Sequence, residues 1–124
     1  MRKVLLLPML VLAAAGGVVS SASAASTHPT RANVVHLIAV GSGLKYDKKV
    51  VTAKAGRITL NFTNASSLQH NIRLGQGETE FGGTKTIGHG STSVVVSLKK
   101  GAYHFYCSVP GHEDAGMTGT LNVT

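Results

Sequence analysis

The sequence predicts an all-β fold, a single-domain Greek-key β-sandwich of seven or eight strands. Short apolar segments rich in β-branched residues recur along the chain, and several alternate between apolar and polar positions. Turn signals, most of them containing glycine, separate these segments at short intervals. No stretch has helical periodicity over a useful length. Together these three patterns are typical of a sandwich.

The first two predicted strands are identified by their composition. Residues 33–40 are rich in Val, Ile and Leu and end at a Gly-Ser-Gly turn. Residues 48–53 contain a Val-Val pair and end just before Ala55-Gly56. Glycine ends strands in this way because it adopts backbone conformations that other residues avoid.

The next two predicted strands are identified by alternation. Residues 57–64 carry an apolar side chain at every second position, and residues 70–74 place His70 on the same face as two apolar residues. The stretch at 75–90 is polar and rich in glycine, so it is predicted to be a surface loop.

The last three predicted strands place a thiol in the core. Residues 91–98 alternate, and a Lys-Gly turn leads into residues 102–107. Within 102–107, Phe105 and Cys107 share a face, so the core-facing Phe105 predicts a core-facing Cys107. The final strand, 118–123, closes the chain.

The N-terminus resembles a secretory signal peptide. Residues 1–24 begin with two basic residues, continue with an apolar run and end at a small-residue Ala-Ser-Ala cleavage pattern. A membrane anchor is the alternative, but the apolar run is shorter than a transmembrane helix requires. We therefore expect a signal peptide at 1–24, a flexible lead-in at 25–32 and one domain at 33–124, exported to the periplasm or another extracytoplasmic part of the cell envelope.

The charge pattern limits the classes of binding partner that we expect. Arg2 and Lys3 leave with the signal, so the mature chain keeps about +5 of the formal +7. The basic residues are scattered, with no arginine-rich run or basic helix, which argues against a nucleic-acid partner. The sequence has no second apolar segment, so no membrane span is predicted. We expect a monomer. The net positive charge predicts a mild preference for acidic partner surfaces.

Four residues of metal-ligand type are predicted to converge. Cys107, His112 and Met117 follow one another at five-residue steps in one irregular loop. Met117 shares its parity with the core-facing residues of the last strand, and His70 shares that of its own strand. Three strand ends and one loop therefore direct sulfur and imidazole ligands toward the core.

This ligand set favours copper. Two imidazoles and a thiolate, with a thioether as a weak axial ligand, are the donors of a blue-copper electron-transfer site, whereas methionine is a poor zinc ligand. A single cysteine also excludes an internal disulfide. The alternatives are that Cys107 is only a small buried apolar residue and that Met117 only fills the core.

The segment "YHFYCSVPGHEDAGMTGTLNV", with "SSLQHNIRL" upstream, resembles the cupredoxins, the plastocyanin, azurin and rusticyanin group of type 1 blue copper proteins. The resemblance covers residues 33–124. It implies one copper ion held by His70, Cys107, His112 and Met117. It also implies that Asn71 bonds to Ser108 and holds the ligand loop, although Asn71 could be an ordinary polar residue at a strand end. The four residues between Cys107 and His112 resemble the azurin or rusticyanin spacing more than that of plastocyanin.

The remaining histidines are not expected to bind the metal. His36 is expected to be half-buried in its strand, His89 to lie in an exposed turn, and His28 and His104 to stay outside the site. Tyr106 points outward beside the thiolate, so it is either an exposed aromatic or part of an electron path.

The expected function is single-electron transfer between transient redox partners by Cu(II)/Cu(I) cycling, with no enzymatic activity. The alternative function is a periplasmic copper carrier or buffer that delivers metal. Such a protein would favour exposed, methionine-rich ligands, whereas the mature chain keeps only Met117.

Overall fold

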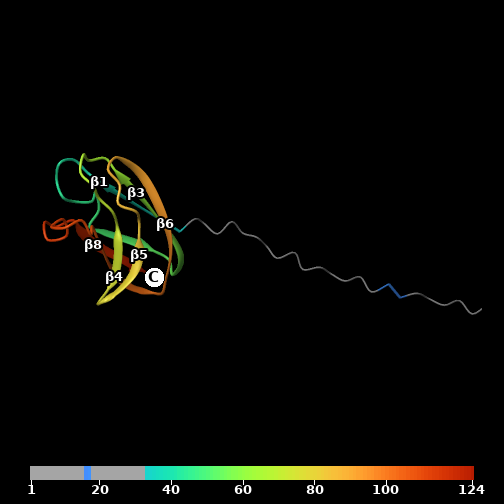
Figure 1. Ribbon diagram of the computed structural model, residues 1–124. Helices are drawn as coiled ribbons and strands as arrows, with labels where there is room; N and C mark the ends of the chain where they lie inside the picture. The colour runs from blue at the N-terminus through green and yellow to red at the C-terminus, as the bar shows by residue number, and fades with distance from the viewer. Residues whose placement is uncertain (1–15, 18–32) are drawn as a thin grey trace, which may run out of the picture.

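The computed structural model describes residues 16–17 and 33–124, and the regular structure of this part of the chain is all β (Figure 1). The predicted all-β class and strand number are confirmed. The predicted signal peptide 1–24 and lead-in 25–32 lie outside the described residues, apart from 16–17. The strands are β1 (Val34–Ala39), β2 (Val50–Ala53), β3 (Gly56–Asn64), β4 (Arg73–Gln76), β5 (Thr79–Gly83), β6 (Gly90–Leu98), β7 (Gly101–Tyr106) and β8 (Thr118–Val123).

Two sheets form the sandwich. The first has the order β1-β3-β6, and the second has the order β2-β8-β7-β4-β5. The β1–β3 and β2–β8 pairs are parallel, and the other pairs are antiparallel. Each sheet therefore contains strands that are far apart along the chain, so neither sheet forms from a local segment alone.

The core lies between the facing sides of the two sheets. Alternation along β3 buries Ile58, Leu60 and Phe62, as the sequence predicts. On the opposite sheet, β7 and β8 bury Phe105 and Leu121. Removing these side chains from water is the main stabilising contribution expected for a domain of this size without a disulfide.

The prediction of a surface loop at 75–90 is wrong for its first half. β4 continues to Gln76, a tight turn follows at Gly77-Glu78, and β5 runs antiparallel to β4. Gly77 has φ +58°, which fits the first position of a two-residue hairpin turn. β5 forms the outer edge of its sheet and its first residues are exposed, so it lacks the apolar alternation that would have identified it.

The predicted strand at 70–74 begins later than expected. Regular pairing starts at Arg73, and His70 instead makes an isolated bridge with Ile87. His70 and Asn71 are both buried, which strict alternation does not allow. The chain leaves regular strand geometry here because both side chains have polar partners on the inside of the molecule.

No helix long and apolar enough to cross a membrane occurs among residues 16–17 and 33–124.

Candidate metal centre

Strand pairing brings the predicted ligand residues to one end of the sandwich. Arg73, the first residue of β4, pairs with Tyr106, the last residue of β7. Tyr106 also pairs with Thr118, the first residue of β8. The residues just before β4, just after β7 and just before β8 therefore meet, and these are the positions of His70, Cys107 and Met117.

The loop between β7 and β8 folds back on itself, and it forms the red-orange projection beyond the sheets in Figure 1. Its base is closed by a hydrogen bond from the Cys107 amide to the Met117 carbonyl, at 3.1 Å. The Met117 amide in turn donates to the His112 carbonyl at 3.0 Å. Gly111 and Gly116 have φ of +80° and +101°, which other residues rarely adopt, and these turns return the loop to its start.

The loop before β4 holds His70 from the other side. The His70 amide and carbonyl bond to the carbonyl and amide of Ile87 at 3.0 and 2.9 Å. Asn64 is fully buried, and its Nδ2 donates to the carbonyls of Leu68 and Ile87 at 2.7 and 2.8 Å. Its Oδ1 accepts the amide and hydroxyl of Ser66. Sequence reasoning missed this organising residue, although Asn followed two residues later by Ser is a local turn signal.

Three atoms that could bind a metal converge in the space between these loops. The Nδ1 atoms of His70 and His112 lie 3.1 Å apart, and the Cys107 Sγ lies 3.8 and 3.6 Å from them. A point equidistant from all three lies about 2.0 Å from each, close to metal–nitrogen distances in proteins and slightly shorter than a metal–sulfur bond. This group is the one set of three or more converging His, Cys, Asp or Glu atoms in the described part of the chain.

The site is enclosed, with one partly accessible side. His70, Cys107 and Met117 have no exposed surface, whereas His112 is partly exposed. Burial, and then the neighbouring His112, lower the pKa of His70 below its ordinary value. The neutral imidazole is the form that binds a metal, so the folded protein favours the binding-competent state of His70.

Comparison with known proteins agrees with this geometry. Residues 32–124 match the family model described as "Copper binding proteins, plastocyanin/azurin family". The chain belongs to this cupredoxin family.

Solved cupredoxin structures share the fold of this chain. The auracyanin of Roseiflexus castenholzii is 27% identical with a TM-score of 0.69, over 74% of this chain and 97% of that chain. Auracyanin B is 26% identical with a TM-score of 0.69, over 75% and 89%. The azurin Az-iso2 of Methylomonas sp. strain J is 22% identical with a TM-score of 0.66, over 74% of this chain and 98% of that chain. At this identity the likeness supports a shared fold only. A search of curated protein sequences finds no significant match.

The residues present fit one type 1 copper. Two imidazole nitrogens and a cysteine sulfur converge and could hold the metal, and the buried Met117 is joined by backbone hydrogen bonds to both Cys107 and His112. This combination of soft sulfur and imidazole donors suits both oxidation states of copper. The cofactor prediction is therefore confirmed at the level of the family and its donor set.

Asn71 connects the two halves of the site. Its Oδ1 accepts the backbone amide of Ser108 at 2.9 Å, and its Nδ2 donates to the Ser108 hydroxyl at 2.8 Å. Because Asn71 follows His70 and Ser108 follows Cys107, these bonds directly join the two segments that carry the candidate ligands His70 and Cys107. The contacts expected from the resemblance are present, and contacts of this kind fix ligand orientation in metal sites.

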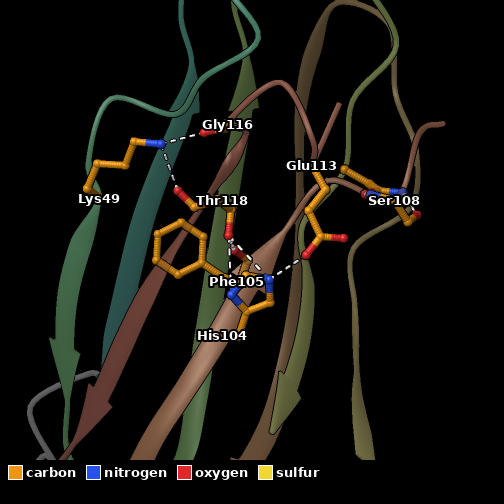
Figure 2. Close-up of polar contacts among 8 residues, drawn as sticks. Lys49, His104, Phe105, Ser108, Glu113, Gly116 and Thr118 are labelled. Carbon is orange, nitrogen blue, oxygen red and sulfur yellow. Dashed lines mark hydrogen bonds and ion pairs between the residues drawn. The ribbon is translucent and has the colours of Figure 1, made fainter. Parts of the chain in front are cut away.

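A second group of polar contacts holds the ligand loop from outside (Figure 2). The His104 ring contacts Glu113 at 2.6 Å, and the hydroxyl of Thr118 lies against the same ring and donates to the Phe105 carbonyl. On the other side, the Lys49 ammonium donates to the carbonyls of Gly116 and Thr118, which flank Met117. Lys49 is one of the scattered basic residues of the sequence, and no local pattern predicts this contact.

The histidines outside the site are mostly placed as predicted. His89 is exposed in a turn, and His104 is exposed on the outer face of β7. The expectation for His36 is wrong, because its side chain points to the outer face of β1 and is exposed. Tyr106 is partly buried and stacks on His104, with ring centroids 5.2 Å apart and an interplanar angle of 19°. His28 lies outside the described residues.

Proposed function

We propose that this protein is a type 1 copper electron carrier that passes single electrons between transient redox partners. The convergence of His70, Cys107 and His112 within one enclosed site supports the proposal most strongly. We further propose that His70, Cys107, His112 and Met117 are the copper ligands. When bound, the copper supplies a one-electron Cu(II)/Cu(I) couple.

The chain's own contribution is a rigid, dry site. Hydrogen bonds at both ends of the ligand loop fix the positions of the donor atoms. The buried sulfur ligands keep water away from one side of the site. A site that moves little between two oxidation states transfers electrons with little reorganisation, so these features favour electron transfer.

The proposed electron exit is the partly exposed edge of His112. Pro110 and Gly111 are exposed beside it, and Val109 is partly buried, which gives a small apolar rim. Glu113 and Asp114 add a local acidic edge on a basic protein. A partner would meet the rim through a small interface, with charge steering the approach more than holding the complex.

Delivery of copper to other proteins is the rival function. A delivery protein must release its metal, which requires ligands that a receiving protein can reach. Here both sulfur ligands are fully buried, and only one of the four proposed ligands is partly exposed. This burial favours a retained cofactor and a carrier role over metal delivery.

We also propose that the protein is exported by a signal peptide at 1–24 and acts as a monomer in the periplasm or another extracytoplasmic part of the cell envelope. The basic and apolar pattern of the N-terminus supports export. Sequencing the N-terminus of protein isolated from the cell envelope would test it, and a retained Met1 would contradict it.

The test of the proposed function is copper loading followed by a challenge with a chelator. One equivalent of Cu(II) should give an intense visible thiolate-to-copper band and a type 1 EPR signal, and both should survive the chelator. A His89→Asn variant is the control for stray binding and should behave as the wild type. A colourless complex would contradict the type 1 site, and rapid loss of copper to the chelator would favour delivery.

A further inference from the structure

Tyr46 is a buried polar residue outside the ligand set. It lies in the connection between β1 and β2, where it makes an isolated bridge with Ala39. Its neighbours Lys45 and Asp47 are exposed, but its own side chain is only 3% exposed. The side chain of Tyr46 therefore points into the molecule, although the connection around it is polar. Its contacts there show what it does.

The ring of Tyr46 packs edge-on against aromatic residues of both sheets. Its centroid is 6.2 Å from that of Phe62 on β3, with an interplanar angle of 80°. It is 5.4 Å from that of Phe105 on β7, with an angle of 66°. Phe105 precedes Cys107 by two residues on the same face, so Tyr46 contacts the strand that delivers the thiolate.

The hydroxyl of Tyr46 reaches the segment that carries His70. It donates a hydrogen bond to the backbone carbonyl of Asn71 at 2.5 Å. The amide of the same peptide group, on Ile72, donates to the Thr84 hydroxyl at 3.0 Å. The Asn71–Ile72 peptide is therefore held on both sides by side-chain hydroxyls.

The phenol remains a donor across the physiological range. Burial, and then the nearby Cys107 and Glu113, raise the pKa of Tyr46 above its ordinary value. A protonated phenol in a buried site needs an acceptor, and the Asn71 carbonyl is the acceptor that it has.

We propose that Tyr46 is a positioning residue of the copper site, whose hydroxyl acts through Asn71 to hold the His70 and Cys107 segments together. The chain of bonds runs from the Tyr46 hydroxyl to the Asn71 carbonyl, and from the Asn71 side chain to the Ser108 amide. Since the ring also packs on Phe105, one side chain fixes both segments. The inference rests on the proposed ligands of the copper site. It adds Tyr46, which is not itself a proposed ligand, as a residue that holds the ligand segments in place.

The physical consequence of losing the hydroxyl is specific. A buried carbonyl without a partner is costly, so the Asn71 peptide would shift to find another donor or water. Such a shift moves the Asn71 side chain, and the bond that it accepts from the Ser108 amide would weaken. The ring packing would survive, because Phe has the same shape without the oxygen.

Tyr46→Phe tests the inference, with Tyr103→Phe as the matched control. Tyr103 is also buried, donates to the Lys99 carbonyl at 2.8 Å, and packs edge-on against Phe81. Lys99 lies beyond the opposite end of β7 from Cys107, so the control removes the same bond far from the site. Both variants should lose some stability.

Only Tyr46→Phe should change the site. In metal-free protein, hydrogen exchange of the Ser108 amide should be about tenfold faster, as expected when one hydrogen bond that protects it is weakened. In copper-loaded protein, the reduction potential should be displaced from the wild-type value and the EPR lines should broaden. Tyr103→Phe should leave the Ser108 exchange rate, the potential and the EPR lines unchanged.

The inference is overturned if Tyr46→Phe matches Tyr103→Phe in Ser108 exchange and in potential. The exchange measurement needs no copper, so it decides the role of Tyr46 even if the wild-type protein forms no type 1 site. If Tyr46→Phe does not accumulate as folded protein, Thr84→Val removes the bond on the other side of the same peptide. That variant should also speed Ser108 exchange, and an unchanged rate would refute the inference.

Discussion

Gly119→Ala should damage the fold at the point where the strands deliver the ligands. Gly119 lies on β8 and pairs with Phe105 on β7. A Cβ at this position would lie 2.2 Å from the Cζ of Phe105, 2.7 Å from its Cε2 and 2.5 Å from the Lys49 carbonyl oxygen. Ordinary carbon contacts are about 3.5–4.0 Å, so the neighbours would have to retreat by more than about 1 Å.

Neither Phe105 nor the Lys49 carbonyl can move away without a cost in stability. Phe105 is fully buried and packs against Tyr46. The Lys49 carbonyl accepts the Thr120 amide at 2.8 Å, so its displacement would break a bond between β8 and its neighbouring segment. Overpacking costs about 1–3 kcal/mol and a lost hydrogen bond about 1 kcal/mol, so we expect about 2–4 kcal/mol of destabilisation.

Urea unfolding of the metal-free protein measures this effect. With an m-value of about 2 kcal/mol/M, the midpoint should fall by about 1–2 M. Gly88→Ala is the matched control, because its Cβ would meet only the Gln69 Nε2, at 3.9 Å, and it should leave the midpoint nearly unchanged. A Gly119→Ala midpoint within the error of the control would refute the close packing of β8 on Phe105.

The remaining predictions concern the site itself. Cys107→Ser should abolish the visible band while circular dichroism still reports a folded sandwich, and a persisting band would refute the thiolate assignment. Met117→Leu should keep copper and colour but raise the reduction potential, since a weak donor is lost; a redox titration with an unchanged potential would make Met117 only a core residue. Val109→Asp should slow electron self-exchange, measured by NMR line broadening, without changing the copper spectrum, and a wild-type rate would move the exit away from His112. The lowered pKa of His70 means that the unfolded chain binds its proton more readily, so metal-free protein should lose stability as the pH falls through about 6.5, and a urea midpoint that does not fall between pH 7.5 and 5.5 would contradict this.

The sequence predicted the parts of the fold that bury an apolar face. β3, β7 and β8 alternate because one side of each strand packs in the core, and their burial follows the predicted parity. β5 was missed because an edge strand can form its backbone bonds without apolar alternation. His36 was misplaced because an apolar strand context does not say which face a single polar residue takes.

The sequence also predicted which residues converge, because strand parity and loop spacing are local properties. It could not predict the residues that hold them from a distance. Tyr46, Asn64 and Lys49 act through bonds to Asn71, Ile87 and Gly116, which are 25, 23 and 67 residues away along the chain. Such contacts depend on how the two sheets are packed, which no local pattern encodes.

The central claim is that the four proposed ligands hold one copper through a reversible one-electron cycle. The most direct measurement is a spectroelectrochemical titration of the copper-loaded protein, followed through repeated reduction and reoxidation. We predict a single one-electron transition, in which the visible band disappears on reduction and returns in full with the copper still bound. Release of copper on reduction, or the absence of an intense visible band in the oxidised protein, would contradict the claim.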